Sequence, residues 1–259
     1  MPESFQHCDI NNMLCIGCRI FGMLKHRASG VFLGKVNIGD ARSYEDRAYE
    51  YEPIYTAVLV KPKPRHQDFY LDEEKKHIAG RKYYFHHSPD VQPHTANGPI
   101  SFSGKPAKRY IQPLDRDTQF HFRIDFTNLE ADEFGALALA VILEEQMRHK
   151  IGYGKPLGLG SIYLVPTCLT LVDYTSRYLQ PDAQRGKTVL QENAMWEELQ
   201  KYIDTFYQQH LQTLAMEDLR RIWRWPPDPD VDYYYPSKRD WFDTAESRGK
   251  RIADTKYTP

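Results

Sequence analysis

Phenylalanine and isoleucine occupy every second position over residues 119–126 (QFHFRIDF), with polar or charged residues between them. A period of two places all the hydrophobic side chains on one face of a β-strand. We therefore predict one strand here, with one buried and one polar face. Shorter strands are predicted at 34–38 (GKVNI) and 54–61 (IYTAVLVK), where β-branched residues cluster.

A helical period follows the strand. The spacing predicts an amphipathic helix over 131–148, with apolar positions at Phe134, Leu137, Ala138, Val141 and Ile142. Thr127 and Glu130, three residues apart, fit a capping box at its start. A second helix is predicted over 189–211, with Met195, Leu199, Ile203, Phe206, His210 and Leu211 on one face, and a third over 216–225, which ends at Pro226 and Pro227.

The segment between the helices completes an α+β pattern. Residues 149–160 are glycine-rich, and 161–166 and 169–173 are predicted as two strands of a hairpin or one bent strand. Strand, helix, glycine loop and strand form the second half of a ferredoxin-like βαββαβ unit; we find no convincing first half. We expect a core over 1–178, with a basic insertion at about 61–113, and a helical and irregular extension over 179–259.

The chain of 259 residues is 41% hydrophobic and 27% charged, with a net charge of -1. These values are typical of a globular protein, and no apolar run approaches the roughly 18 residues of a membrane span. Residues 61–113 hold ten Lys or Arg against five Asp or Glu, so the chain could present one basic face. Residues 1–10 lack the pattern of a signal peptide, and we expect a cytoplasmic protein without membrane contact.

Three of the four cysteines cluster near the start of the chain, in the spacing Cys8-x6-Cys15-x2-Cys18. Two thiolates with two residues between them can bind one tetrahedral zinc ion, and Cys8 could supply a third ligand. The fourth ligand would be His26 or His7. A structural zinc is favoured over a catalytic one; reduced thiols or a redox pair are the alternatives.

Residues 149–161 (HKIGYGKPLGLGS) combine four glycines with two lysines. Exposed backbone amides and lysine side chains form a cradle for anions. The loop follows a helix and lacks GK[ST], so neither a dinucleotide-binding nor a Walker fingerprint fits. The alternative is a helix-to-strand connection without a ligand.

Residues 80–87 (GRKYYFHH) combine basic residues, aromatics and histidines. Aromatic rings can stack on bases, and Arg and Lys can hold phosphates, so the segment suits RNA. A strand whose alternate aromatics are buried explains it equally well. His86 and His87 are also weak candidates for metal binding or general base catalysis. No Ser-His-Asp or HExxH signature is found.

The order of these blocks resembles the CRISPR-associated RAMP superfamily. The stretch Cys15-x2-Cys18-Arg19-Ile20-Phe21-Gly22, followed by Gly34-Lys35-Val36 and Asp40-Ala41, is similar to that superfamily's CxxCxLFG and GxVxxxDA motifs. The blocks at 80–87, 122–137 and 149–161 follow in the same order, and the resemblance covers about residues 8–180. The resemblance is to the C-terminal portion of such a protein, because the first strand and first helix of the superfamily are not found in this sequence.

The resemblance implies a backbone subunit of a type III CRISPR effector complex, with a ferredoxin-like, RNA-recognition-motif-like core. Such a subunit binds guide RNA and other effector subunits, meets target RNA indirectly, and in some cases carries zinc. The expected RNA-binding residues are Lys150, Gly152, Gly154, Lys155, Gly158 and Gly160, with Arg81, Lys82, Tyr83 and Tyr84 as weaker candidates.

Two other functions remain open from the residues alone. A metal-dependent endoribonuclease would use Asp or His side chains, although the family's N-terminal catalytic loop is not found in this sequence. A structural, zinc-containing interaction protein would have no affinity for RNA.

Overall fold

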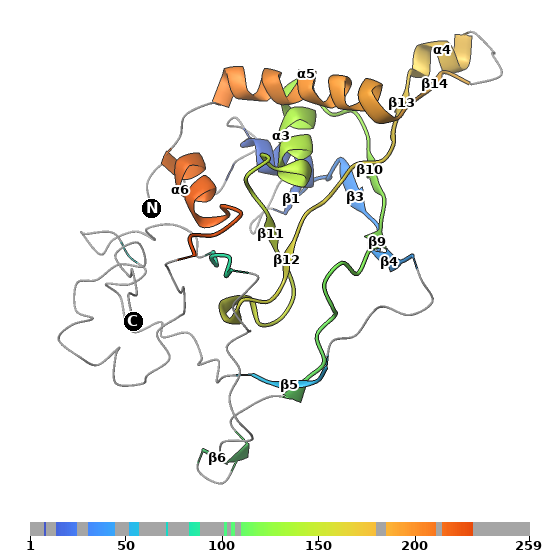
Figure 1. The fold of residues 1–259 in the computed structure, drawn as a ribbon. Coiled ribbons are helices and arrows are strands. Elements are labelled where there is room, and N and C mark those ends of the chain that lie inside the picture. Colours follow the sequence, from blue (N-terminus) through green and yellow to red (C-terminus); the bar gives the residue numbers. More distant parts are fainter. Residues whose placement is uncertain are drawn as a thin grey trace.

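The computed structural model describes residues 8, 14–24, 31–44, 52–56, 71, 83–88, 101–102, 105–106, 110–179, 185–210 and 214–229, and Figure 1 shows their arrangement. The helices are α1 (Ile16–Phe21), α3 (Ala131–Ile142), the 3-10 turn η2 (Lys155–Leu157), α4 (Tyr174–Leu179), α5 (Glu192–His210) and α6 (Leu214–Ile222). The described chain is therefore mixed α and β.

The described strands form short antiparallel pairs. They are β1 (Met23–Leu24) with β2 (Val31–Phe32), β3 (Val36–Ile38) with β10 (Ile124–Phe126), β4 (Arg42–Ser43) with β9 (Phe120–His121), β5 (Ile54–Tyr55) with β8 (Tyr110–Ile111), β6 (Ser101–Phe102) with β7 (Lys105–Pro106), β11 (His149–Lys150) with β12 (Ser161–Ile162), and β13 (Leu169–Val172) with β14 (Lys187–Leu190). The class α+β is confirmed at this level.

The predicted strand over 119–126 is two strands, β9 and β10. Ile124 pairs with Ile38 and His121 pairs with Arg42, so three residues, 39–41, lie opposite two residues, 122–123. One extra residue on one side is the arrangement of a β-bulge, which interrupts the ladder. The predicted alternation is confirmed over residues 121–126, although Phe122, Ile124 and Phe126 are half-buried rather than buried. Phe120, predicted on the buried face, is exposed.

The predicted helix over 131–148 begins as expected but ends six residues early. Its capping box joins Glu130 and Glu133, not Thr127 and Glu130: Oε2 of Glu133 accepts the N–H of Glu130 at 3.0 Å. The helix ends because Leu143 adopts a positive φ of 63° while its N–H still bonds the carbonyl of Leu139.

The core lies where α3 meets α5. The residues buried there are Phe134, Ala138, Leu139, Leu169, Met195, Leu199 and Ile203. Gly135 permits this contact, since a Cβ on it would lie 2.1 Å from the carbonyl oxygen of Tyr202. The buried positions predicted for α5 at Met195, Leu199 and Ile203 are confirmed. The core takes residues from both sides of position 178, the boundary predicted between core and extension.

Two predictions for residues 161–190 are wrong. The segments beginning at 161 and 169 form no hairpin with each other, since β12 pairs with β11 and β13 pairs with β14. Val189 lies in β14, not in a helix, and α5 begins at Glu192. Strands β13 and β14 and helix α4 project from the body, whereas β11 and β12 run down from α3 to the glycine loop (Figure 1).

Candidate functional site

The cysteine cluster forms around the first turn of α1. One ligand atom from each of Cys8, Cys15 and Cys18 lies within 4.8 Å of the other two. A zinc–sulfur length of about 2.3 Å in a tetrahedral site separates two sulfurs by about 3.8 Å, so small side-chain movements bring all three thiols to one ion. The N–H of Cys15 donates to Sγ of Cys8 at 3.3 Å, and that of Cys18 donates to Sγ of Cys15 at 3.5 Å.

The surroundings of Cys15 and Cys18 shift the pKa values of these two thiols in opposite directions. Burial, hydrogen bonds and the charges of Cys15 and Cys8 raise the pKa of Cys18 to about 12. Burial also raises the pKa of Cys15, but hydrogen bonds from Cys18 and Cys8 outweigh it, so this pKa is lowered. A bound cation would let more than one thiolate form, because it offsets their repulsion. Three described cysteines can therefore hold a metal ion; His26 and His7, the predicted fourth ligands, lie outside the described residues.

A partly buried ionic network around the buried Glu133 ties this cluster to the core. Lys35 Nζ lies 2.7 Å from Oε2 of Glu133, and Arg19 Nη1 lies 3.2 Å from Oε1 of the same carboxylate. Arg19 also pairs with Asp132, and this bond raises the pKa of Arg19. Because Arg19 belongs to α1 and both acidic residues belong to α3, the network fixes the helix that carries Cys18.

The glycine-rich loop joins β11 to β12. Gly152, Gly154, Gly158 and Gly160 all have positive φ, between 73° and 95°. The N–H of Ile151 donates to the carbonyl of Gly160 and closes the base of the loop, whereas those of Leu157 and Leu159 both donate to the carbonyl of Gly154 within it. The exposed part of the loop is residues 151–153, which we call its tip, and an added Cβ on Gly152 there meets nothing within 4 Å. A Cβ on Gly160, at the base, would lie 1.9 Å from the carbonyl oxygen of Ile151. The loop is thus tightly built at its base and open at its tip.

The two lysines of the loop have different surroundings. Lys150 turns inward, where its ammonium donates to the carbonyls of Gly158 and Leu159 at 3.2 and 2.8 Å. Burial and the charge of Lys155 lower the pKa of Lys150 to about 8. Lys155 is less buried and donates to the carbonyl of Gly152 at 2.8 Å. An ammonium has three donors, so Lys155 retains hydrogens for an anion at the tip.

Two buried histidines support the loop from beneath. His86 Nε2 donates to the carbonyl of Arg148 at 2.9 Å, so Nδ1 accepts from the hydroxyl of Ser161 at 2.8 Å. Burial lowers the pKa of His86 to about 4, although the hydrogen bond to the carbonyl of Arg148 acts in the opposite direction and raises it. A Cβ on Gly158 would lie 3.2 Å from the ring of His87. The ring nitrogens of His86 are thus occupied by protein partners, as expected of a packing residue.

Residues 83–88, the described part of the aromatic segment, form no strand. Tyr83 is partly exposed and contacts Trp223 edge-on, with ring centroids 5.3 Å apart; Tyr84 is half-buried. Arg81 and Lys82 lie outside the described residues. Only the two tyrosines of this predicted RNA-binding group can therefore be located.

Arg148 and Tyr163 were not singled out by the sequence. The guanidinium carbon of Arg148 lies 5.4 Å from the centroid of the Tyr163 ring, and this ring is 68% exposed. Tyr153, at the tip of the glycine loop, is also exposed. The contact depends on the pairing of β11 with β12, which places residue 148 opposite residue 163 and which no pattern in the sequence indicates.

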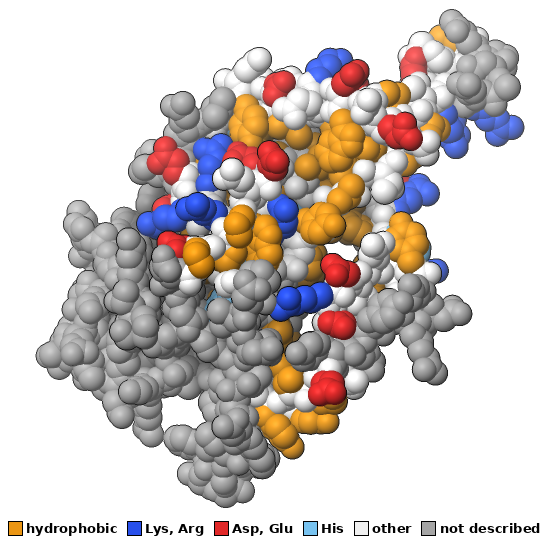
Figure 2. Space-filling model, viewed as in Figure 1, with side chains coloured by type: hydrophobic (Ala, Val, Ile, Leu, Met, Phe, Trp, Pro, Cys, Tyr) orange, Lys and Arg blue, Asp and Glu red, His pale blue; other side chains and the backbone are white. Residues whose placement is uncertain are grey.

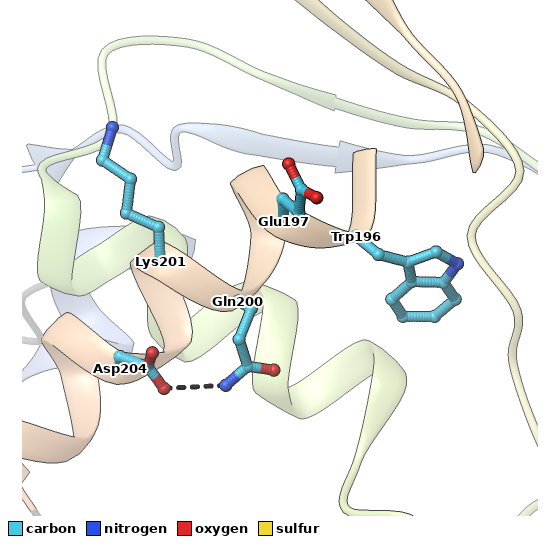
Figure 3. A pocket seen from close by; sticks show the side chains of 5 residues that line it. All are labelled: Trp196, Glu197, Gln200, Lys201 and Asp204. Carbon is cyan, nitrogen blue, oxygen red and sulfur yellow. Dashed lines mark hydrogen bonds between the residues drawn. The ribbon is translucent and has the colours of Figure 1, made fainter. Parts of the chain in front are cut away.

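Two hollows adjoin Trp196 on α5. The larger, of about 520 Å³, is lined by Trp196, Glu197, Gln200, Lys201 and Asp204. Figure 3 shows these side chains spreading away from the helix, with one hydrogen bond between Gln200 and Asp204. The smaller, of about 260 Å³, lies between α3 and α5. Polar groups in binding sites converge on a ligand, and those of the larger hollow do not.

Charges of both signs are mixed over the face in Figure 2, around hydrophobic side chains in its middle. The basic face predicted from 61–113 falls mainly outside the described residues. Among the described residues, the cysteines form the one group of three or more metal-ligating side chains.

Comparison with protein-family models and with curated proteins finds no match for this chain. In the described part of the chain, every helix is too short or too polar to cross a membrane.

Proposed function

We propose that this chain is an RNA-binding subunit of a type III-like CRISPR effector complex, in which the tip of the glycine loop holds the phosphate backbone of guide RNA. The observation that carries the proposal is the open tip at Gly152 beside the ammonium of Lys155. Small residues let a phosphate approach the backbone closely, and the lysine adds charge. The ordered motifs that resemble RAMP proteins support the CRISPR assignment.

The proposal includes a ferredoxin-like core and the expected partners. β10, α3 and β12 follow one another in the order strand, helix, strand of that unit's second half, with β11 and the glycine loop inserted before β12. Other effector subunits would bind this chain, and target RNA would meet it through the guide. Within this proposal Lys150 acts inside the loop, since its ammonium holds two loop carbonyls, and Lys155 contacts phosphate.

We also propose that Cys8, Cys15 and Cys18 bind a structural zinc ion, with His26 as the fourth ligand. The donor set supports this proposal, because three thiols near one point are a typical zinc environment. Zinc here would join the segment before α1 to the helix that Arg19 ties to the core.

Binding of a fluorescent single-stranded RNA, measured from low to moderate salt, tests the RNA proposal. Affinity should fall steeply with salt because each phosphate contact releases counterions, and Lys155→Gln should reduce the slope of log K against log salt by about 0.7. Lys201→Gln, on α5, which lies on the far side of α3 from β11 and β12 (Figure 1), is the matched control and should leave the slope unchanged. A salt-independent affinity, or equal effects of both variants, would overturn the proposal.

Purification with its genomic neighbours tests the CRISPR assignment. Short RNAs that share a repeat-derived end should copurify with the tagged chain. A folded sample without RNA would favour a structural role, and RNA cleavage that chelation abolishes would favour a nuclease.

A further inference from the structure

The pairing of β11 with β12 brings a cation beneath an exposed aromatic ring. His149 pairs with Ile162 and Lys150 with Ser161; the next pair in this antiparallel register is Arg148 with Tyr163. Paired residues project from the same face of a sheet. The guanidinium carbon accordingly lies 5.4 Å from the ring centroid, within the range of a cation–π contact.

Arg148 is held by hydrogen bonds at both its side chain and its main chain. Its Nη1 donates to the carbonyls of Glu145 and Met147 at 2.8 and 2.7 Å. Its backbone N–H donates to the carbonyl of Trp223 at 3.0 Å, and its carbonyl accepts from His86. The cation beneath Tyr163 is thus fixed at both its main chain and its side chain, so the tyrosine lies on a preorganised support.

The ring itself remains open to solvent. Tyr163 is 68% exposed although one side of its ring faces the guanidinium. A flat aromatic surface of this kind, backed by a positive charge, suits a flat π-system that is attached to an anion. An unpaired nucleobase with its phosphate has both properties, and stacking of a base on an aromatic side chain contributes about 1–3 kcal/mol.

The platform lies close to the proposed phosphate site. Gly152 follows Arg148 by four positions along the chain, a span of about 13 Å in an extended strand. Exposed Ile151 lies between them in the sequence, and exposed Tyr153 follows Gly152. One short strand could therefore reach both the loop tip and the ring, but a duplex could not, because its bases are stacked on one another.

We infer that Tyr163, supported by Arg148, is a stacking platform for one unpaired base of the RNA strand whose phosphates the glycine loop holds. This inference rests on the proposed function and specifies its ligand: single-stranded RNA, recognised by base stacking as well as by charge. The phenol hydroxyl is not required, since the ring face makes the contact.

Two ligands of equal length and charge separate stacking from phosphate binding: a single-stranded RNA 12-mer and the same backbone without bases. Tyr163→Ala should weaken binding of the RNA about tenfold, which corresponds to about 1.4 kcal/mol, and leave binding of the abasic strand unchanged. Tyr163→Phe, the matched control, should bind both strands like the wild type. An equal affinity of Tyr163→Ala and wild type for the RNA would overturn the platform but leave the proposed function intact.

A fluorescent base gives a measurement that needs no variant. 2-Aminopurine placed in turn along the RNA should be quenched at one or more positions on binding to the wild-type chain, as stacking on a ring requires. RNA that binds without quenching at any position would overturn the platform alone. Failure of the wild type to bind either strand at low salt would overturn the proposed function and this inference together.

Discussion

The ammonium of Lys35 lies 2.7 Å from Oε2 of Glu133, a carboxylate whose side chain is only 1% exposed. The same carboxylate accepts the N–H that begins α3 and faces Arg19 of α1. One buried acid therefore joins the start of β3, the helix of the cysteine cluster and the first turn of the main core helix. Charges buried in this way require partners, because desolvation without compensation is costly.

Replacement of Lys35 should destabilise the fold. Lys35→Met leaves Glu133 with one of its two cations, and we expect a loss of about 3 kcal/mol in the free energy of unfolding. Lys201→Met removes an exposed pair, Lys201–Glu198 at 3.7 Å, and should cost less than about 1 kcal/mol. Urea unfolding of both variants measures the difference. Equal losses would show that the Lys35–Glu133 pair is not the source of stability.

The low pKa of His86 predicts that stability falls in mild acid. The folded-state pKa is about 4, and the unfolded value is about 6.5. As the pH falls, His86 therefore takes up a proton in the unfolded chain before it does so in the folded protein. The contribution of neutral His86 to the free energy of unfolding is fully present above about pH 6.5 and is lost as the pH falls toward 4. Between pH 7 and 5 the loss should be about 2 kcal/mol.

Comparison with a variant isolates this effect from the other nine histidines. His86→Gln cannot titrate, although its amide can still donate to the carbonyl of Arg148. The variant should be less stable than the wild type at pH 7, and the gap should narrow by about 2 kcal/mol at pH 5. A gap that stays constant across this range would contradict a neutral, buried His86.

The three clustered cysteines should retain zinc through purification. We expect one zinc ion per wild-type chain by elemental analysis, and much less in Cys15→Ser or Cys18→Ser. Cys168→Ser is the matched control, because Cys168 is an exposed thiol outside the cluster. A chelator should lower the thermal midpoint of the wild type and the control but not of the cluster variants. Full zinc content in Cys18→Ser would show that the metal lies elsewhere.

The buried positions of a periodic helix could be predicted from the sequence, but the points at which strands and helices are interrupted could not. The apolar spacing of α5 identifies its buried positions at Met195, Leu199 and Ile203. The break between β9 and β10 depends instead on an extra residue in the opposite strand. The end of α3 at Leu143 depends on a positive φ that leucine rarely adopts. Neither feature follows from the local preference of the residues involved.

The candidate site shows the same division. Its glycines and cysteines could be found by residue type and spacing, because few other residues can replace them. The inward direction of Lys150 and the contact of Arg148 with Tyr163 could not be predicted. Both depend on the register of β11 with β12, which a sequence pattern does not determine. His86 was considered for chemistry, but its burial makes it a support of the loop.

Two glycines of the loop should differ sharply in their tolerance of alanine. Gly160 and Gly152 have nearly the same positive φ, 80° and 79°, so each Gly→Ala change costs about 1 kcal/mol in backbone conformation. At Gly160 the new Cβ would also lie 1.9 Å from the carbonyl oxygen of Ile151, whereas at Gly152 it would meet nothing within 4 Å. Gly160→Ala should therefore lose at least about 2 kcal/mol more than Gly152→Ala in urea unfolding. Because φ is matched, the difference between the two losses in free energy of unfolding measures how closely the two strands approach at the loop base. Similar losses for the two variants would mean that this base is not closed as described.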